Sequence, residues 1–279
     1  MATCKLPSLG IGTFQLKDPS QLYEVIDKAL ECDIRLIDTA QCYKNEEIIG
    51  NMITDLLKKH ALMRSDIKIV SKLDPKNHGT DKAFHAVQNT LRNLGGFVDV
   101  MLIHWPGASK IKCNDPVVKE LRKESWKVLE SFYLAGSIGA IGVSNYTHNH
   151  LSELMSHCSI KPSVVQNEFH PRYIESDVLQ FCQKNDIQYM GYSPFGKGDL
   201  LMNKTIGNIA AKHNVTVSQV LIKWSLQQSI TCIPRTSRPE RIVENFAAIS
   251  NLKLDCQDME AIHELNDNHK YCWDPKSVT

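Results

Sequence analysis

The sequence predicts an α/β fold in which eight parallel strands close into a (β/α)8 TIM barrel. Apolar runs rich in β-branched residues alternate with amphipathic helical stretches almost to the end of the chain, a pattern typical of a parallel sheet with helical crossovers. Eight such runs are present, which is the number that closes a barrel of this kind. Polar residues also recur at one end of successive runs, where barrel enzymes keep their active sites.

The predicted elements follow one another as strand and then helix. Strands are expected near residues 8–14, 34–39, 67–72, 98–104, 138–143, 163–168, 187–192 and 229–234. Helices are expected near residues 19–32, 45–59, 80–94, 116–135, 147–157, 175–185, 203–213 and 239–247. Turn-forming pairs fall between these elements rather than inside them. Since no linker or repeat divides the chain, we predict one domain over residues 1–279.

An open, doubly wound sheet is the alternative reading of the same alternation. A dinucleotide-binding sheet of that kind carries Gly-x-Gly-x-x-Gly directly after its first strand. Gly10 and Gly12 supply only the first half of this motif, and Thr13 and Phe14 follow. The barrel is therefore favoured.

The composition excludes several classes of protein. The formal net charge is +1 and basic residues are spread along the chain, so a nucleic-acid partner is not expected. The nine cysteines form no Cys-x-x-Cys pair and no metal-ligand cluster, which favours free thiols in a reducing compartment. The N-terminus lacks a basic and then apolar leader, and no run approaches the roughly 20 apolar residues that span a bilayer. We expect a cytoplasmic protein without a bound metal.

The second, third and fourth strands each end in side chains suited to acid catalysis. Asp38 and Tyr43 lie on the turn between a strand and the helix that begins at Asn45. Lys72 ends the third strand and His104 follows the fourth. A phenol with a reference pKa of about 10 is a poor acid near neutral pH, and a nearby cation is the usual way to lower that pKa. We predict that Lys72 supplies the cation for Tyr43.

The next three strands end in amides, hydroxyls and a phenol. Ser144 and Asn145 follow the fifth strand, Gln166 closes the sixth, and Tyr192 with Ser193 closes the seventh. Amides and a hydroxyl can hold a flat carboxamide while an aromatic ring stacks on a heteroaromatic face. A nicotinamide has this combination, although each residue considered alone is also an ordinary helix cap or loop residue.

The eighth strand runs into a basic helix start. Arginines and hydroxyls gather where backbone amides already favour an anion. The predicted cofactor residues in this segment are Arg235, Thr236, Ser237, Arg238, Arg241, Glu244 and Asn245, with Gly12 and Thr13 from the first strand. One charge-assisted bond to phosphate contributes roughly 1.5 to 3 kcal/mol, or a preference of about tenfold or more. The sequence therefore favours NADP, which carries a 2′-phosphate, over NAD.

Taken together, these residues resemble the aldo-keto reductase superfamily over nearly the whole chain. The matching motifs are Asp-Thr-Ala-Gln-Cys-Tyr-Lys-Asn-Glu at 38–46, Ser-Lys-Leu around Lys72, Ile-His-Trp-Pro at 103–106, Ile-Gly-Val-Ser-Asn-Tyr at 141–146, Gln-Asn-Glu-Phe-His-Pro at 166–171, Tyr-Ser-Pro at 192–194 and the segment from Ile233. The resemblance implies a TIM barrel, NADPH bound without a Rossmann domain, and a catalytic tetrad that here is Asp38, Tyr43, Lys72 and His104. It also implies reduction of aldehydes or ketones to alcohols.

The chain departs from the family pattern at its ends and at two site positions. The N-terminal hairpin that commonly plugs the barrel is expected to be absent or very short. Arg235 stands where lysine is usual, and Phe14 replaces a frequent tryptophan. The short C-terminal segment with Trp273 resembles compact members, such as microbial-type and prostaglandin F synthase-like reductases.

The resemblance suggests a monomer that acts on small carbonyl compounds. Phe14, Trp105 and Trp273 are predicted to form an apolar pocket over the nicotinamide, which favours hydrophobic or aromatic aldehydes. A second reading from a different class is an NADPH-binding regulatory or structural barrel with negligible turnover. The intact tetrad argues against that reading.

Overall fold

Eight parallel strands lie side by side in chain order in a computed structural model that describes residues 5–250 and 252–279. The strands are β1 (Ile11–Gly12), β2 (Leu36–Asp38), β3 (Lys68–Leu73), β4 (Val98–Ile103), β5 (Ile138–Ser144), β6 (Val164–Glu168), β7 (Gln188–Tyr192) and β8 (Thr231–Ile233). All eight fall within the predicted ranges, apart from the extension of β3 and β5 by one residue.

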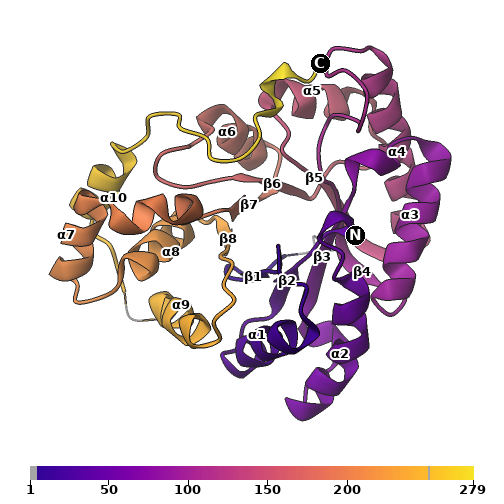
Figure 1. Ribbon diagram of the computed structural model, residues 1–279. Coiled ribbons are helices and arrows are strands. Elements are labelled where there is room, and N and C mark those ends of the chain that lie inside the picture. Colours follow the sequence, from indigo (N-terminus) through magenta and orange to yellow (C-terminus); the bar gives the residue numbers. More distant parts are fainter. Residues whose placement is uncertain (1–4, 251) are drawn as a thin grey trace.

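The sheet closes on itself between β8 and β1. Gly10 N donates to Cys232 O at 2.9 Å, Cys232 N donates to Ser8 O at 2.8 Å, and Gly12 N donates to Pro234 O at 3.0 Å. Figure 1 shows the strands at the centre with the helices arranged around them. The predicted (β/α)8 barrel is confirmed, and the open doubly wound alternative is wrong.

Ten α-helices surround the barrel in the described part of the chain. They are α1 (Pro19–Glu31), α2 (Glu46–Lys59), α3 (Thr80–Asn93), α4 (Val117–Leu134), α5 (His148–His157), α6 (Ser176–Lys184), α7 (Lys204–Lys212), α8 (Val217–Gln227), α9 (Glu240–Ser250) and α10 (Cys256–His263). The eight predicted helices are present, and α8 and α10 are additional helices that were not predicted. A capping box signals α8, because Thr216 N donates to Gln219 Oε1 at 3.0 Å and Gln219 N donates back to Thr216 Oγ1 at 3.3 Å.

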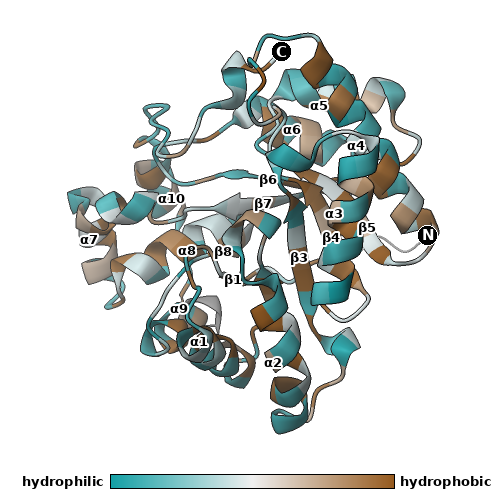
Figure 2. Cartoon of the chain, turned by 45° about the vertical axis from the view of Figure 1, so that its right-hand side comes forward, coloured by the Kyte–Doolittle hydropathy of each residue, from teal (hydrophilic) through white to brown (hydrophobic). Residues whose placement is uncertain are grey.

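Apolar side chains fill the barrel and the layer between the strands and the helices. The interior cluster contains Leu6, Leu36, Val70, Val100, Leu102, Ala140, Val164, Met190 and Ile233. The intervening strand positions, such as Ile37 and Ile69, pack outward against the helices. In Figure 2, β3 and β4 are largely brown while the helices carry teal and brown residues on different sides. Burial on both faces explains why these strands read as continuous apolar runs.

The expectation that an N-terminal hairpin is absent or very short falls partly on residues 1–4, which lie outside the described residues. Leu6 is 3% exposed and belongs to the interior cluster. Its backbone N–H donates to Gln188 Oε1 at 2.9 Å, and Gln188 Nε2 donates to Leu6 O at 3.1 Å. The segment before β1 therefore contributes a side chain to the barrel interior.

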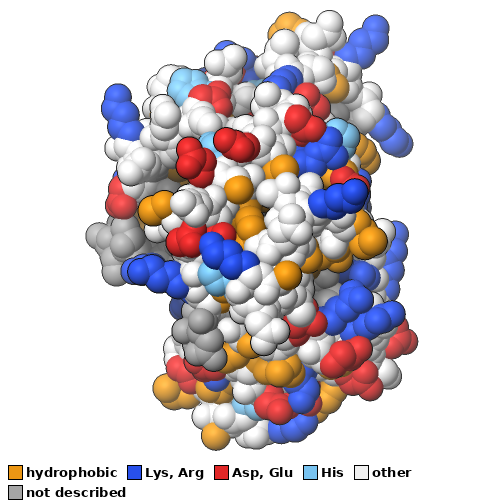
Figure 3. Space-filling model, turned by 90° about the vertical axis from the view of Figure 1, so that its left-hand side faces the viewer, with side chains coloured by type: hydrophobic (Ala, Val, Ile, Leu, Met, Phe, Trp, Pro, Cys, Tyr) orange, Lys and Arg blue, Asp and Glu red, His pale blue; other side chains and the backbone are white. Residues whose placement is uncertain are grey.

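The surface carries mixed charge. On the face in Figure 3, basic and acidic side chains are interspersed and neither sign dominates, in keeping with the net charge of +1. Every helix within residues 5–250 and 252–279 is too short or too polar to span a bilayer. The eight cysteines in this part of the chain are all free thiols.

Candidate active site

The site arises from the two-residue period of the strands. Every second side chain points to the same face of a strand, so an apolar interior residue is followed two positions later by another interior residue. On β2 and β3, Leu36 is followed by Asp38 and Val70 by Lys72. The same step places polar side chains at the carboxyl ends of other strands. These are Ser144 on β5, Gln166 and Glu168 on β6, and Tyr192 on β7.

Lys72 and Asp38 form a fully buried ion pair. Lys72 Nζ lies 2.7 Å from Asp38 Oδ1, and the two side chains are 0% and 3% exposed. The ammonium also donates to Thr39 O at 2.8 Å, while Gln166 Nε2 donates to Asp38 Oδ2 at 2.7 Å. Adjacent strands β2 and β3 deliver the pair, which fixes its geometry.

Tyr43 lies beside this ion pair. It ends a one-turn 3-10 helix, η1 (Gln41–Tyr43), after which Lys44 adopts a left-handed conformation with φ of 59° and leads into α2. Lys72 Nζ lies 3.5 Å from Tyr43 Oη and 4.9 Å from the centroid of its ring. The predicted proximity of the ammonium and the phenol is therefore present.

The expected lowering of the Tyr43 pKa is wrong. Burial raises the pKa of Tyr43 well above its usual value, and the negative charge of Asp38 raises it further. The Asp38 carboxylate lies 2.7 Å from Lys72 Nζ, so it offsets the field of the ammonium at the phenol. Tyr43 therefore keeps its proton at neutral pH.

His104 supplies a neutral imidazole next to Tyr43. Their ring centroids are 5.8 Å apart in an edge-on arrangement. Burial, and then the positive charge of Lys72, lowers the pKa of His104 to about 3. Cys42 Sγ lies 3.5 Å from His104 Nδ1, and burial raises the pKa of this thiol to about 11. Near neutral pH the imidazole is uncharged and keeps one N–H to donate.

Asn145 joins the predicted carboxamide-binding residues to His104. Its Nδ2 donates to His104 O at 2.9 Å and to Ser144 Oγ at 3.1 Å, and its Oδ1 accepts from Tyr192 Oη at 2.6 Å. The Ser144 hydroxyl retains its own proton, and the Asn145 oxygen retains one acceptor lone pair. A carboxamide needs one donor and one acceptor of this kind, so the residues present fit such a group.

The basic segment after β8 is exposed, but its members differ in what they bind. Arg235 Nε donates to Phe14 O at 3.0 Å, which ties this guanidinium to the loop after β1. Thr236 Oγ1 accepts from Arg238 N at 3.0 Å. Arg238 and Arg241 are exposed at the start of α9, and within the described residues neither forms an ion pair with a carboxylate. Free guanidinium groups at a helix N-terminus fit a phosphate.

Two other predicted cofactor residues, Glu244 and Thr13, have structural partners. Thr216 Oγ1 donates to Glu244 Oε1 at 2.8 Å, and the Ser218 hydroxyl donates to the same oxygen, so Glu244 is bound to the N-terminus of α8. Thr13 Oγ1 donates to Asp38 O at 2.9 Å.

The remaining predicted cofactor positions are Asn245, Ser237, Gly12 and Ser193. Asn245 is 5% exposed, and Ser237 is half-buried. Gly12 lies opposite Arg235 across the β1–β8 seam. Ser193 adopts a positive φ of 55°, and its Oγ lies 3.8 Å from Cys272 Sγ.

The three predicted substrate residues form two aromatic pairs. Phe14 is 51% exposed and meets Tyr43 edge-on at 5.1 Å between ring centroids. Trp273 is 82% exposed and meets Trp105 edge-on at 6.3 Å. One exposed ring, that of Phe14, therefore lies beside Tyr43, and the other, that of Trp273, lies beside Trp105 after β4.

Two residues that were not predicted to belong to the site, Asn45 and Gln41, hold the Tyr43 turn. Asn45 Nδ2 donates to Thr13 O at 3.0 Å and to Leu16 O at 2.9 Å, which fixes the loop that carries Phe14. Gln41 Oε1 accepts from Asp74 N at 2.9 Å and thus joins η1 to the loop after β3. Both residues lie inside the motif at 38–46, but nothing in their spacing identifies these partners.

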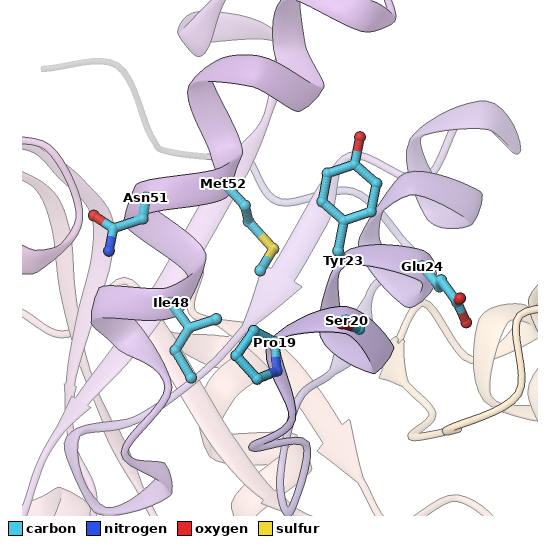
Figure 4. A pocket seen from close by; sticks show the side chains of 7 residues that line it. All are labelled: Pro19, Ser20, Tyr23, Glu24, Ile48, Asn51 and Met52. Carbon is cyan, nitrogen blue, oxygen red and sulfur yellow. The ribbon is translucent and has the colours of Figure 1, made fainter.

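A separate hollow of about 550 Å³ lies between α1 and α2. In Figure 4, Ile48 and Met52 on α2 stand opposite Pro19 and Tyr23 on α1. None of the predicted site residues lines this hollow. The polar cluster at the carboxyl ends of the strands is therefore the candidate active site.

Comparison with known proteins identifies similar chains. The family model described as Aldo/keto reductase family matches residues 8–267. Glyoxal reductase from Bacillus subtilis (strain 168) is 36% identical over 267 residues, which cover 95% of this chain and 91% of that protein.

Two solved structures extend the likeness to the fold. MGS-M4, an aldo-keto reductase from a Medee basin deep-sea metagenome library, has a TM-score of 0.89 and 34% identity, and 99% of this chain and 97% of that chain are covered. An aldo-keto reductase from Bombyx mori, solved in complex with NADP, has a TM-score of 0.85 and 26% identity, with 96% and 91% covered.

Proposed function

This chain belongs to the aldo-keto reductase family, and on that premise we propose that it reduces aldehydes or ketones with NADPH, with Tyr43 as the general acid. The proposal rests on one observation above the others: the phenol oxygen of Tyr43 lies 3.5 Å from the buried ammonium of Lys72. The glyoxal reductase relative and the NADP complex of the Bombyx mori enzyme support the reaction and the cofactor. When bound, the reduced nicotinamide supplies the hydride for the carbonyl carbon.

Side chains of the protein donate the proton to the carbonyl oxygen and stabilise the negative charge that develops during the reaction. Tyr43 stays protonated because its pKa is raised, so its O–H is available to the carbonyl oxygen of a substrate. Once the proton has left, the nearby Lys72 ammonium stabilises the tyrosinate. Neutral His104 donates its N–H to the same oxygen. Asp38 and Thr39 hold the ammonium in place.

Replacing the phenol tests this role directly. Tyr43→Phe removes the proton donor and keeps the ring, so turnover is expected to fall roughly 100-fold to 10,000-fold while NADPH affinity is retained. NADPH absorbance with benzaldehyde measures turnover, and protein fluorescence measures binding. Tyr23→Phe on α1 is the matched control and should leave both unchanged. Full turnover by Tyr43→Phe would remove this residue from the mechanism.

The exposed guanidinium groups of Arg238 and Arg241 support recognition of a 2′-phosphate. Arg241→Ala is expected to weaken NADPH binding about tenfold and to leave NADH binding unchanged, because only NADPH carries that group. Arg92→Ala, an exposed arginine on α3, is the control. An equal loss for the two cofactors would contradict the assignment.

We further propose that residues 1–279 form one barrel domain that acts as a cytoplasmic monomer on small carbonyl compounds. The exposed rings of Phe14 and Trp273 favour hydrophobic or aromatic substituents on the substrate. The molar mass measured by light scattering, as the protein elutes from a size-exclusion column, tests whether it is a monomer.

A further inference from the structure

Glu168 is a buried carboxylate that the proposed reaction does not use. It ends β6 two residues after Gln166, on the same side of the strand, and it is 0% exposed. A charge removed from water in this way needs close partners. Its partners therefore show what Glu168 does.

Three of the four residues that contact the carboxylate come from the far end of the chain. Tyr271 N donates to Glu168 Oε1 at 2.7 Å, and Cys272 N donates to Glu168 Oε2 at 3.1 Å. Lys270 Nζ lies 2.9 Å from Oε2, and His170 Nε2 lies 3.0 Å from Oε1. Three consecutive residues, Lys270 to Cys272, thus converge on one carboxylate.

These bonds hold the carboxylate in its charged form. Burial alone raises the pKa of Glu168, but the hydrogen bond from His170 and the charge of Lys270 outweigh burial and bring the pKa to about 2. Charged acceptors make stronger hydrogen bonds than neutral ones. The segment is therefore fastened more firmly here than two ordinary backbone bonds would fasten it.

The fastened segment, residues Asp267–Trp273, is called the C-terminal strap below. In Figure 1 the yellow chain after α10 runs along the side of the strands where β6 and β7 lie and continues toward α5. Lys197 Nζ also donates to Tyr271 O at 2.6 Å, and Arg172 pairs with Asp267. Trp273 follows the fastened residues directly, and its ring meets Trp105 after β4.

We propose that Glu168 is a positioning residue for substrate selection: it fixes the C-terminal strap so that Trp273 stands against Trp105 as an apolar wall of the site. This inference rests on the proposed carbonyl reduction. Because Trp273 is 82% exposed, little besides the strap and Trp105 defines its place. The wall favours aromatic aldehydes, whereas a small aldehyde does not reach it.

Glu168→Gln tests this role with a matched control. The glutamine side chain has nearly the same volume as Glu168 but carries no charge. Its NH2 group also faces hydrogen-bond donors, with which it cannot pair. With benzaldehyde, KM is expected to rise about tenfold while kcat is retained, and with propanal both constants stay unchanged. Glu130→Gln is the control, because Glu130 Oε1 likewise accepts two consecutive backbone N–H groups, from Ser159 at 2.7 Å and Ile160 at 2.8 Å. The control should leave both substrates unaffected.

A double variant separates positioning from general structural damage. If Glu168 acts through Trp273, then Glu168→Gln adds nothing to the benzaldehyde KM of Trp273→Ala. Additive effects, or an equal loss for benzaldehyde and propanal, would overturn the proposal.

A readout independent of turnover distinguishes this proposal from the proposed function. Exchange of the Tyr271 and Cys272 amide hydrogens should accelerate about tenfold or more in Glu168→Gln and remain slow in Glu130→Gln. Unchanged amide exchange would contradict the claim that Glu168 fixes the C-terminal strap. Should Glu168→Gln fail to fold, Lys270→Met removes one partner of the same carboxylate without altering β6, and the same shifts in exchange and in benzaldehyde KM are expected. Accelerated exchange in an enzyme that turns over no carbonyl would refute the proposed function alone.

Discussion

Replacing Lys72 by methionine is expected to cost more stability than almost any other single charge change in the barrel. The substitution keeps most of the apolar stem and removes the ammonium. Asp38 then stays buried without its cation, with only Gln166 Nε2 bound to its Oδ2. The carbonyl of Thr39 also loses its donor from Lys72.

The expected loss follows from burial. Removing one partner of a buried ion pair costs about 3 to 5 kcal/mol, because the remaining charge has no compensation. A domain of this kind has a total stability of about 5 to 15 kcal/mol, so the variant loses a large share of it. Adding Asp38→Asn to the Lys72→Met variant removes the uncompensated carboxylate charge and should restore part of the lost stability.

Urea unfolding of the cofactor-free protein, followed by tryptophan fluorescence, measures the difference. Lys59→Met is the matched control, since Lys59 Nζ also lies 2.7 Å from a carboxylate oxygen, that of Asp27, but its side chain is 52% exposed. The control should lose far less free energy of unfolding than the buried variant. Equal losses for Lys72→Met and Lys59→Met would refute the reasoning that burial sets the strength of the effect.

Two further predictions concern a titrating group and a close contact. His104 has a folded pKa of about 3 against about 6.5 unfolded, so below pH 6.5 the unfolded chain binds the extra proton and stability falls as the pH drops toward 3. His104→Asn should lessen this fall in urea titrations between those pH values; parallel profiles would contradict the pKa. Gly50→Ala should destabilise the fold by about 1 to 3 kcal/mol, because the new Cβ would lie 1.7 Å from Asn93 O. Gly207→Ala, with no neighbour within 4 Å, should stabilise α7 by about 0.5 to 1 kcal/mol, and thermal unfolding that ranks the two alike would refute the packing argument.

The strands were predictable because each is a short apolar run buried on both faces. The two missed helices lacked a comparable apolar pattern. In α8, the residues Val220, Leu221 and Ile222 are buried in succession, so no helical period stands out. In α10, only Asp258 and Ile262 are buried, and a short polar helix resembles a loop in sequence.

The candidate site was predictable where the two-residue period of a strand sets direction. Asp38 and Lys72 each follow an interior apolar residue by two positions, and so they face the same space. The two-residue period does not predict contacts with residues that lie far along the chain. Glu168 binds residues about a hundred positions later, and Glu244 turns to α8 rather than to the cofactor segment, because tertiary packing decides both. The pKa of Tyr43 likewise depends on burial, which no local pattern records.

The seam between β1 and β8 has a consequence for how the protein is made. The hydrogen bonds of Gly10 and Cys232 join residues separated by most of the chain, so a ribosome must deliver β8 before β1 gains its second neighbour. Until Thr231 emerges, the nascent sheet has an unpaired edge at β1 and another at β7. The barrel therefore stays open at these two edges until β8 has been synthesised and can pair with both of its neighbours.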